Sequence, residues 1–157
     1  MDHPHNEFEL THYKVFRVNM PLYHKGPTRH HIYVETNDSL PSFRGFTGHK
    51  FQVIGVKSKP MIFAKIDCSQ PFRSCKEAEL LHVGWVLCND FVDRVKEICR
   101  TVPPPSPDQP LRCCHEWTDA AIGALHAAGV LEEPRSFDNT EIVRYVATPE
   151  QAQQGRS

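Results

Sequence analysis

Up to residue 86, the hydrophobic residues of this chain lie in short segments in which apolar and polar side chains alternate. Apolar residues at helical spacing are found only after residue 86. Alternation of apolar and polar side chains suits a strand with one buried face, whereas apolar residues three or four apart suit a helix. Strands are predicted over residues 13–18, 30–35, 51–56, 61–66, 80–86 and 141–147. Because strands come first and helices late, we expect an α+β fold, an antiparallel sheet with packed helices.

Two helices are predicted on either side of a proline-rich stretch. The first carries Phe91, Val95 and Ile98 at helical spacing and ends near residue 102. The second begins at Cys114 and ends at Gly129, since glycine readily adopts the left-handed conformation that terminates helices. Between them, residues 103–110 read PPPSPDQP, and their five prolines predict a stiff loop.

The length of 157 residues is that of one ordinary domain. Residues 1–10 and 148–157 are polar and hold few core-forming side chains. We therefore expect a flexible N-terminal lead-in over 1–10, a single α+β domain over 11–147 that includes the proline-rich loop 103–110, and a flexible C-terminal tail over 148–157.

The charge of the chain is nearly balanced, with a formal net charge of -1 at pH 7. No strong positive field is therefore expected to attract nucleic acid or anionic lipid. No apolar run approaches the roughly 18 residues of a membrane span, and the polar start lacks the basic and apolar regions of a signal peptide. These features predict a cytoplasmic or nuclear protein with no transmembrane segment and no nucleic-acid partner.

Six cysteines are present, and no two of them form a CxxC pair. Without a signal peptide, free thiols are expected rather than disulfides. Zinc knuckles usually need close-spaced ligand pairs, so we expect neither a metal nor another cofactor. The ten histidines leave one alternative, a metal-binding protein with His30, His31 and either Cys113 or Cys114 as ligands.

Cys114 stands directly after the proline-rich loop, at the first turn of a predicted helix. Unpaired backbone N–H groups and the helix dipole favour a thiolate there, which makes the sulfur a nucleophile. Such a nucleophile needs an imidazole within reach and a third polar group that orients the ring. His30 and His31 open a predicted strand, Gln52 interrupts the apolar residues of the next one, and His49 is a rival base.

Three short motifs together resemble the circularly permuted papain-like fold of NlpC-like, lecithin:retinol acyltransferase-like and PPPDE-type thiol enzymes. They are a histidine heading the strand HIYVE, a polar residue in FQVIG, and CHEW opening a later helix, over roughly residues 28 to 130. In these families the nucleophilic cysteine has an aromatic residue three positions on, as Cys114 has Trp117. The chain also resembles small fungal proteins with an RHH strand and a C-x-x-W helix start.

The resemblance also guides the choice of base. The position that holds the histidine in these families is Arg29 here. Because side chains alternate along a strand, His31 lies on the same side as position 29 and His30 on the other side. We therefore favour His31 over His30. Gln52 matches the position that orients the imidazole, where histidine is common.

The resemblance implies a thiol-dependent hydrolase or an acyl or aminoacyl transferase acting on an amide or ester bond through a Cys–His pair. Its substrate would be a peptide, a protein or a small acyl or aminoacyl compound. Arg29, His115 and Trp117 flank the expected site and are candidates for binding that substrate. The alternative, besides the metal-binding protein, is a non-catalytic interaction module on the same fold, with PPPSPDQP as a polyproline ligand.

Overall fold

The computed structural model describes residues 11–20, 29–36, 48–54, 62–68, 77–105, 113–134 and 143–146. The predicted terminal segments 1–10 and 148–157, and residues 106–110 of the proline-rich loop, lie outside the described residues. Among the helices of the described ranges, none combines the length and apolar character needed to cross a membrane.

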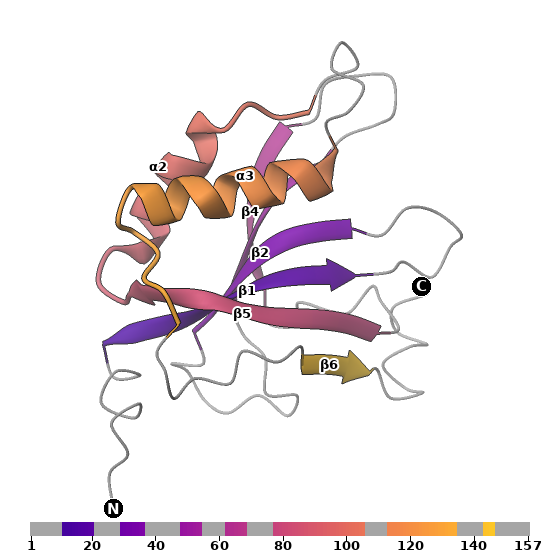
Figure 1. Cartoon of the computed structure of the whole chain (residues 1–157), viewed down its shortest axis with the longest axis horizontal. Coiled ribbons are helices and arrows are strands. Elements are labelled where there is room, and N and C mark those ends of the chain that lie inside the picture. The colour runs from indigo at the N-terminus through magenta and orange to yellow at the C-terminus, as the bar shows by residue number, and fades with distance from the viewer. Residues whose placement is uncertain are drawn as a thin grey trace, which may run out of the picture.

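In the described part of the chain, six strands form one antiparallel sheet in the order β4-β3-β2-β1-β5-β6 (Figure 1). Their bounds are β1 His12–Met20, β2 Arg29–Glu35, β3 Gly48–Ile54, β4 Ile62–Cys68, β5 Glu77–Leu87 and β6 Val143–Val146. Antiparallel strands joined in this way bring distant segments into direct register. The predicted α+β architecture with an antiparallel sheet is confirmed.

The strand bounds differ from those predicted where long-range pairing overrides local preference. β1 continues through Asn19 to Met20, because it pairs with β2 on one side and β5 on the other. β5 begins at Glu77, three residues before the predicted start, where it pairs with β6. A poor strand former is tolerated when both of its neighbours supply backbone hydrogen bonds.

Both described helices, α2 (Phe91–Thr101) and α3 (Cys114–Ala127), cover the same face of the sheet (Figure 1). Their apolar stripes close the main core against the strands, as the spacing predicts. The fully buried members from the sheet and the helices include Val15, Ile32, Val34, Phe51, Val86, Val95, Cys99, Ala121 and Leu125. A smaller cluster on the opposite face comprises Phe16, Val18, Met20, Tyr33, Ala78 and Leu80.

The end of α3 follows the prediction from Gly129. Its φ of 73° is left-handed, and its N–H donates to the carbonyl of His126 at 3.0 Å. The next N–H, of Val130, donates to the carbonyl of Leu125 at 3.0 Å. This pair of bonds is a Schellman motif, which satisfies carbonyls left open at the helix end.

Candidate functional site

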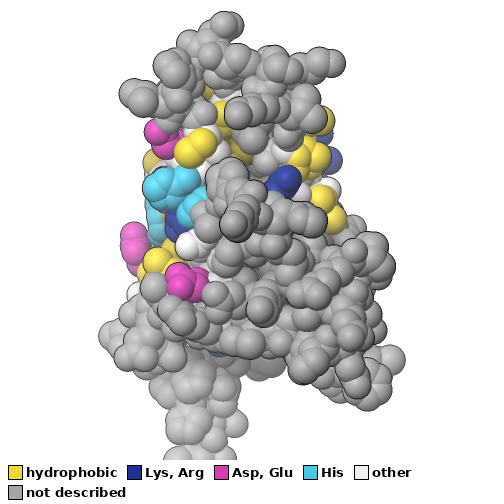
Figure 2. All heavy atoms as spheres, turned by 90° about the vertical axis from the view of Figure 1, so that its right-hand side faces the viewer, with side chains coloured by type: hydrophobic (Ala, Val, Ile, Leu, Met, Phe, Trp, Pro, Cys, Tyr) yellow, Lys and Arg dark blue, Asp and Glu magenta, His cyan; other side chains and the backbone are white. Residues whose placement is uncertain are grey.

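The first turn of α3 lies beside the start of β2, and side chains of the two elements meet there. The ring centroids of His30 and His115 are 4.7 Å apart. Figure 2 shows histidine side chains gathered on this side of the molecule around a basic side chain. Cys114, the residue before His115, is half-buried and packs against the edge of the main core. The structure therefore brings a β2 imidazole to the helix turn that begins with Cys114.

Among the described residues, no side chain caps the start of α3. Cys113 occupies the N-cap position in extended conformation, and its own carbonyl accepts the N–H of Trp117 at 3.0 Å. The remaining N–H groups of a first helical turn have no partner within the helix. Together with the helix dipole, they favour negative charge at this position.

Arg17 of β1 connects the imidazole to the helix. Its Nη1 donates to Nδ1 of His30 at 3.0 Å, and its Nε donates to Oδ1 of Asp119 at 2.7 Å. The second carboxylate oxygen of Asp119 lies 3.5 Å from Nε2 of His115. The side chain of Arg17 is only 15% exposed, so this network is partly shielded from water. One carboxylate thus holds both the guanidinium and the second imidazole.

The environment of His30 favours its neutral form. Burial lowers the pKa of His30 below its usual value of 6.5, and the charges of Arg17 and His115 lower it further. Asp119 opposes these effects by raising the pKa, but it ranks last among them. These effects together favour the neutral imidazole of His30 over the imidazolium.

His31, the base favoured from the sequence, lies on the opposite face of the sheet. Its strand neighbour Ile32 belongs to the core under α3, and successive side chains alternate between faces. His31 is 1% exposed, and within the described part of the chain neither ring nitrogen has a hydrogen-bond partner. Burial, first, and the charge of Lys50 hold its pKa well below 6.5. His30 replaces His31 as the candidate imidazole.

Gln52 and Arg29 also fail to reach the start of α3. Gln52 alternates with Phe51 and Val53, which belong to the main core, so its side chain points away from the helices. Arg29 is exposed and pairs with Met20, a member of the cluster on the far face. The imidazole is held by Arg17 instead of Gln52.

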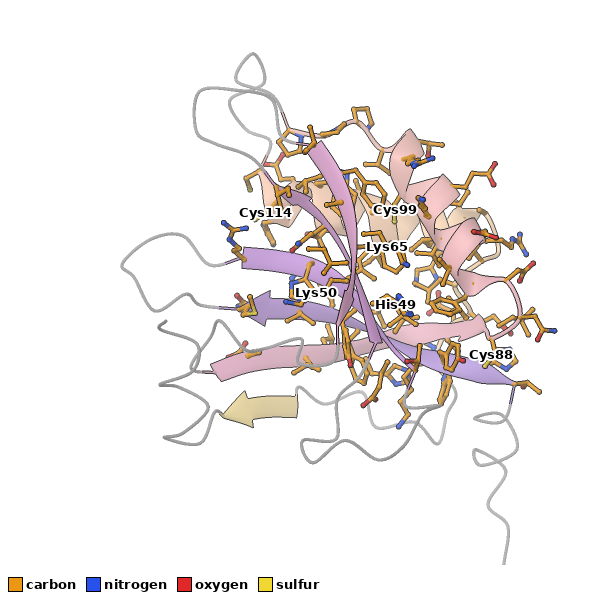
Figure 3. All side chains as sticks on the ribbon, turned by 180° about the vertical axis from the view of Figure 1, so that it is seen from behind. His49, Lys50, Lys65, Cys88, Cys99 and Cys114 are labelled. Carbon is orange, nitrogen blue, oxygen red and sulfur yellow. The ribbon has the colours of Figure 1, made fainter. Side chains whose placement is uncertain are left out.

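The rival base His49 faces the helices, but at another part of the sheet. It pairs with Val34, four residues along β2 from His30, a separation of about 13 Å at ~3.3 Å per residue. Its ring contacts Phe91 at the start of α2, with centroids 5.3 Å apart. Figure 3 places His49 well away from Cys114.

Trp117, a candidate for substrate binding, is a core residue with one polar contact. It is 2% exposed, and its Nε1–H donates to the carbonyl of Val102 at 3.3 Å. Its ring also forms one wall of a pocket of about 210 Å³ beside α3. The other lining residues are Val102, Pro103, Pro105, Glu116 and Ala120.

Pro105, in the same pocket wall, is buried. Pro103, which lines the same pocket, is exposed, and residues 106–110 lie outside the described part of the chain, so the polyproline ligand stays a prediction.

The ligands expected for a metal-binding protein do not come together in the structure. His30 and His31 project from opposite faces of β2, so they cannot share one ion. Across the ranges that the structure describes, no three His, Cys, Asp or Glu side chains gather in a way that could hold a metal.

Sequence reasoning missed Arg17 and Asp119. The one signal for Arg17 was a single cation inside an otherwise apolar segment, VFRV, where a buried charge needs a partner. Asp119 carried no such signal, because a carboxylate in the first turns of a helix is common. Their pairing spans 102 positions and depends on how α3 docks on the sheet.

Comparison with known proteins matches residues 18–132 to a protein family described as "Family of unknown function (DUF6540)". No curated protein matches the chain. No solved structure matches it either.

Proposed function

We propose that this chain, which belongs to the DUF6540 family, is a thiol-dependent hydrolase or acyl transferase that acts on an amide or ester bond. The nucleophile is Cys114. The observation that carries the proposal is the 4.7 Å contact between the rings of His30 and His115. Since consecutive Cα atoms are about 3.8 Å apart, this contact sets two imidazoles beside the backbone that carries the thiol.

The roles of the two imidazoles follow from their hydrogen bonds. A guanidinium has donors only, so Nδ1 of His30 must accept from Arg17. Neutral His30 therefore carries its proton on Nε2, where it can donate a hydrogen bond to an oxyanion. It cannot accept the thiol proton while Arg17 occupies Nδ1 and a proton occupies Nε2.

His115 is the proposed acceptor of the thiol proton. It is exposed, follows Cys114 in the chain, and lies near the carboxylate of Asp119, which stabilises the imidazolium that forms. A carboxylate in this position plays the part of the third member of a catalytic triad.

The reaction balances with these groups alone. His115 takes the proton of Cys114, the sulfur attacks the carbonyl carbon, and a tetrahedral oxyanion forms. Its collapse breaks the C–N or C–O bond, and the imidazolium of His115 gives its proton to the departing amine or alcohol. Water or an amine then attacks the acyl thioester while His115 takes its proton, and the released thiolate of Cys114 takes that proton back from His115.

Alkylation by iodoacetamide, mapped by mass spectrometry, tests the nucleophile. Cys113 is exposed and Cys114 half-buried, so accessibility alone makes Cys113 the faster thiol. We expect the reverse, with Cys114 reacting about tenfold faster at pH 7 because His115 accepts its proton as the sulfur attacks. Labelling of Cys114 no faster than Cys113 contradicts the proposal.

Two histidine variants sharpen the same measurement. His115→Gln should slow alkylation of Cys114, because the proton acceptor is removed. His49→Gln is the matched control, since that imidazole faces the same side of the sheet but contacts Phe91. Equal slowing by the two variants contradicts the assigned role of His115.

A further inference from the structure

A second chain of hydroxyl, imidazole and carboxylate lies at the other end of β1. The hydroxyl oxygen of Thr11 is 2.7 Å from Nδ1 of His12, and Nε2 of His12 is 2.7 Å from Oε2 of Glu132. His12 is seven residues along β1 from Asn19, the partner of His30, so the two sites are about 23 Å apart at ~3.3 Å per residue. The thiol site does not use any of these three residues.

The carboxylate is held in place by backbone pairing. Glu132 donates its N–H to the carbonyl of Trp85 at 2.8 Å and accepts the N–H of Trp85 at 2.9 Å. This bridge fastens the segment after α3 to β5, the strand that pairs with β1 at His12. Gly84 permits the approach, because a Cβ there would meet the Glu132 carbonyl oxygen at 2.1 Å.

The hydrogen bonds determine the tautomer of His12. An ionised carboxylate only accepts, so Nε2 of His12 must donate to Glu132. In neutral His12 the other nitrogen, Nδ1, is then an acceptor, and the Thr11 hydroxyl must donate to it. A hydroxyl that donates to an imidazole whose other nitrogen donates to a carboxylate is the arrangement of an activated nucleophile.

We propose that Thr11, His12 and Glu132 form a second acyl-transfer site, whose substrates are esters of short acyl chains. Thr11 is exposed, so its hydroxyl is accessible. Leu87, which pairs with His12, is 48% exposed and offers an apolar surface for a short acyl group. Lys14, two residues on and therefore on the same face, has its ammonium 5.8 Å from the centroid of the Trp85 ring and adds positive charge to this face.

The reaction is a transfer of the acyl group to oxygen. The Thr11 oxygen attacks the ester carbonyl carbon while its proton passes to Nδ1 of His12, and Glu132 stabilises the imidazolium. The tetrahedral intermediate expels the alcohol oxygen, which takes that proton from Nδ1. Thr11 is left as an acyl ester, which water hydrolyses with His12 again acting as base and then as acid.

Acetylation by p-nitrophenyl acetate tests this site in the full chain carrying Cys114→Ala, so that the proposed thiol nucleophile is absent. We expect release of p-nitrophenol with one acetyl group on Thr11, located by peptide mapping. Glu132→Gln should slow acetylation at least tenfold, because the imidazolium loses its charged partner. Thr11→Ser should retain acetylation at position 11, and Thr11→Val should abolish it there.

Thr101 is the internal control, because its hydroxyl donates to the carbonyl of Ile98 rather than to an imidazole. Acetylation of Thr11 no faster than that of Thr101 overturns the proposal, as does acetylation confined to lysine residues. Circular dichroism of each variant establishes that the fold is retained. The alkylation of Cys114 is measured separately, so either site can fail without the other.

Discussion

Replacing Gly84 by alanine should destabilise the protein through a steric conflict with the segment after α3. The new Cβ would lie 2.1 Å from the carbonyl oxygen of Glu132 and 2.9 Å from Cδ1 of Leu131, and the φ of 154° is unfavourable for a residue with a side chain. Overpacking typically costs about 1–3 kcal/mol, and a sparsely populated backbone conformation about 1–3 kcal/mol.

The cost has an upper limit, since the segment can move away. Displacement would break the two hydrogen bonds between Trp85 and Glu132, at about 1 kcal/mol each, and expose Leu131, at about 1.5–3 kcal/mol. The protein either tolerates the clash in place or displaces the segment, and the response with the lower free-energy cost determines the loss of stability. We therefore expect Gly84→Ala to lower the free energy of unfolding by about 2–5 kcal/mol.

Urea denaturation followed by circular dichroism measures this loss, and two other glycines separate its causes. Gly129 has a φ of 73°, and a Cβ added there would meet no atom within 4 Å, so Gly129→Ala isolates backbone strain and should cost about 1 kcal/mol. Gly123 is helical and equally open, so Gly123→Ala should stabilise by about 1 kcal/mol. A Gly84→Ala loss no larger than that of Gly129→Ala would refute the steric reasoning.

Three further outcomes are expected. Burial lowers the pKa of His31, so as the pH falls below about 6.5 the unfolded chain takes up a proton on this imidazole before the folded chain does. The contribution of neutral His31 to the free energy of unfolding is therefore present above about pH 6.5 and decreases below it. His31→Leu should weaken this pH dependence, as measured by urea titrations at pH 7.5, 6.5 and 5.5. Trp117→Phe removes the donor to the Val102 carbonyl and should lower the free energy of unfolding by about 1–3 kcal/mol, measured in the same titration. Burial raises the pKa of Cys99 to about 12, so iodoacetamide at pH 8 should leave Cys99 unlabelled in the native protein and label it in urea. If Cys99 of the native protein is labelled as fast as the exposed Cys113, its burial is contradicted.

The local parts of the fold were predictable from the sequence because their signals lie within a few residues. The spacing of Phe91 and Val95 predicted α2, and the structure buries both. Gly129 predicted the end of α3 because few other residues adopt its conformation easily. Gly84 was harder to interpret, since a strand glycine indicates close approach without naming the partner, which the structure identifies as the segment 131–132.

The candidate sites were predictable only in part. Cys114 does open a helix, as the sequence predicted, and the nearby imidazole does come from the strand beginning RHH. The choice between His30 and His31 required knowledge of which face of the sheet α3 covers. Because side chains alternate between faces, a shift of one residue along β2 moves the imidazole to the opposite face. Arg17 gave only the weak signal of a cation in an apolar strand, and its role depends on Asp119, a residue from another element.

What the sequence by itself determined was the set of elements: alternating segments that form strands, two apolar stripes that form helices, and a thiol at the start of the second helix. The tertiary structure decided which side chains meet. His12 reaches Glu132 across 120 positions, and His30 reaches His115 only because α3 docks beside β2. The physical reason is that periodicity depends on neighbours a few bonds away, whereas a site depends on strand register and on the face that packing buries.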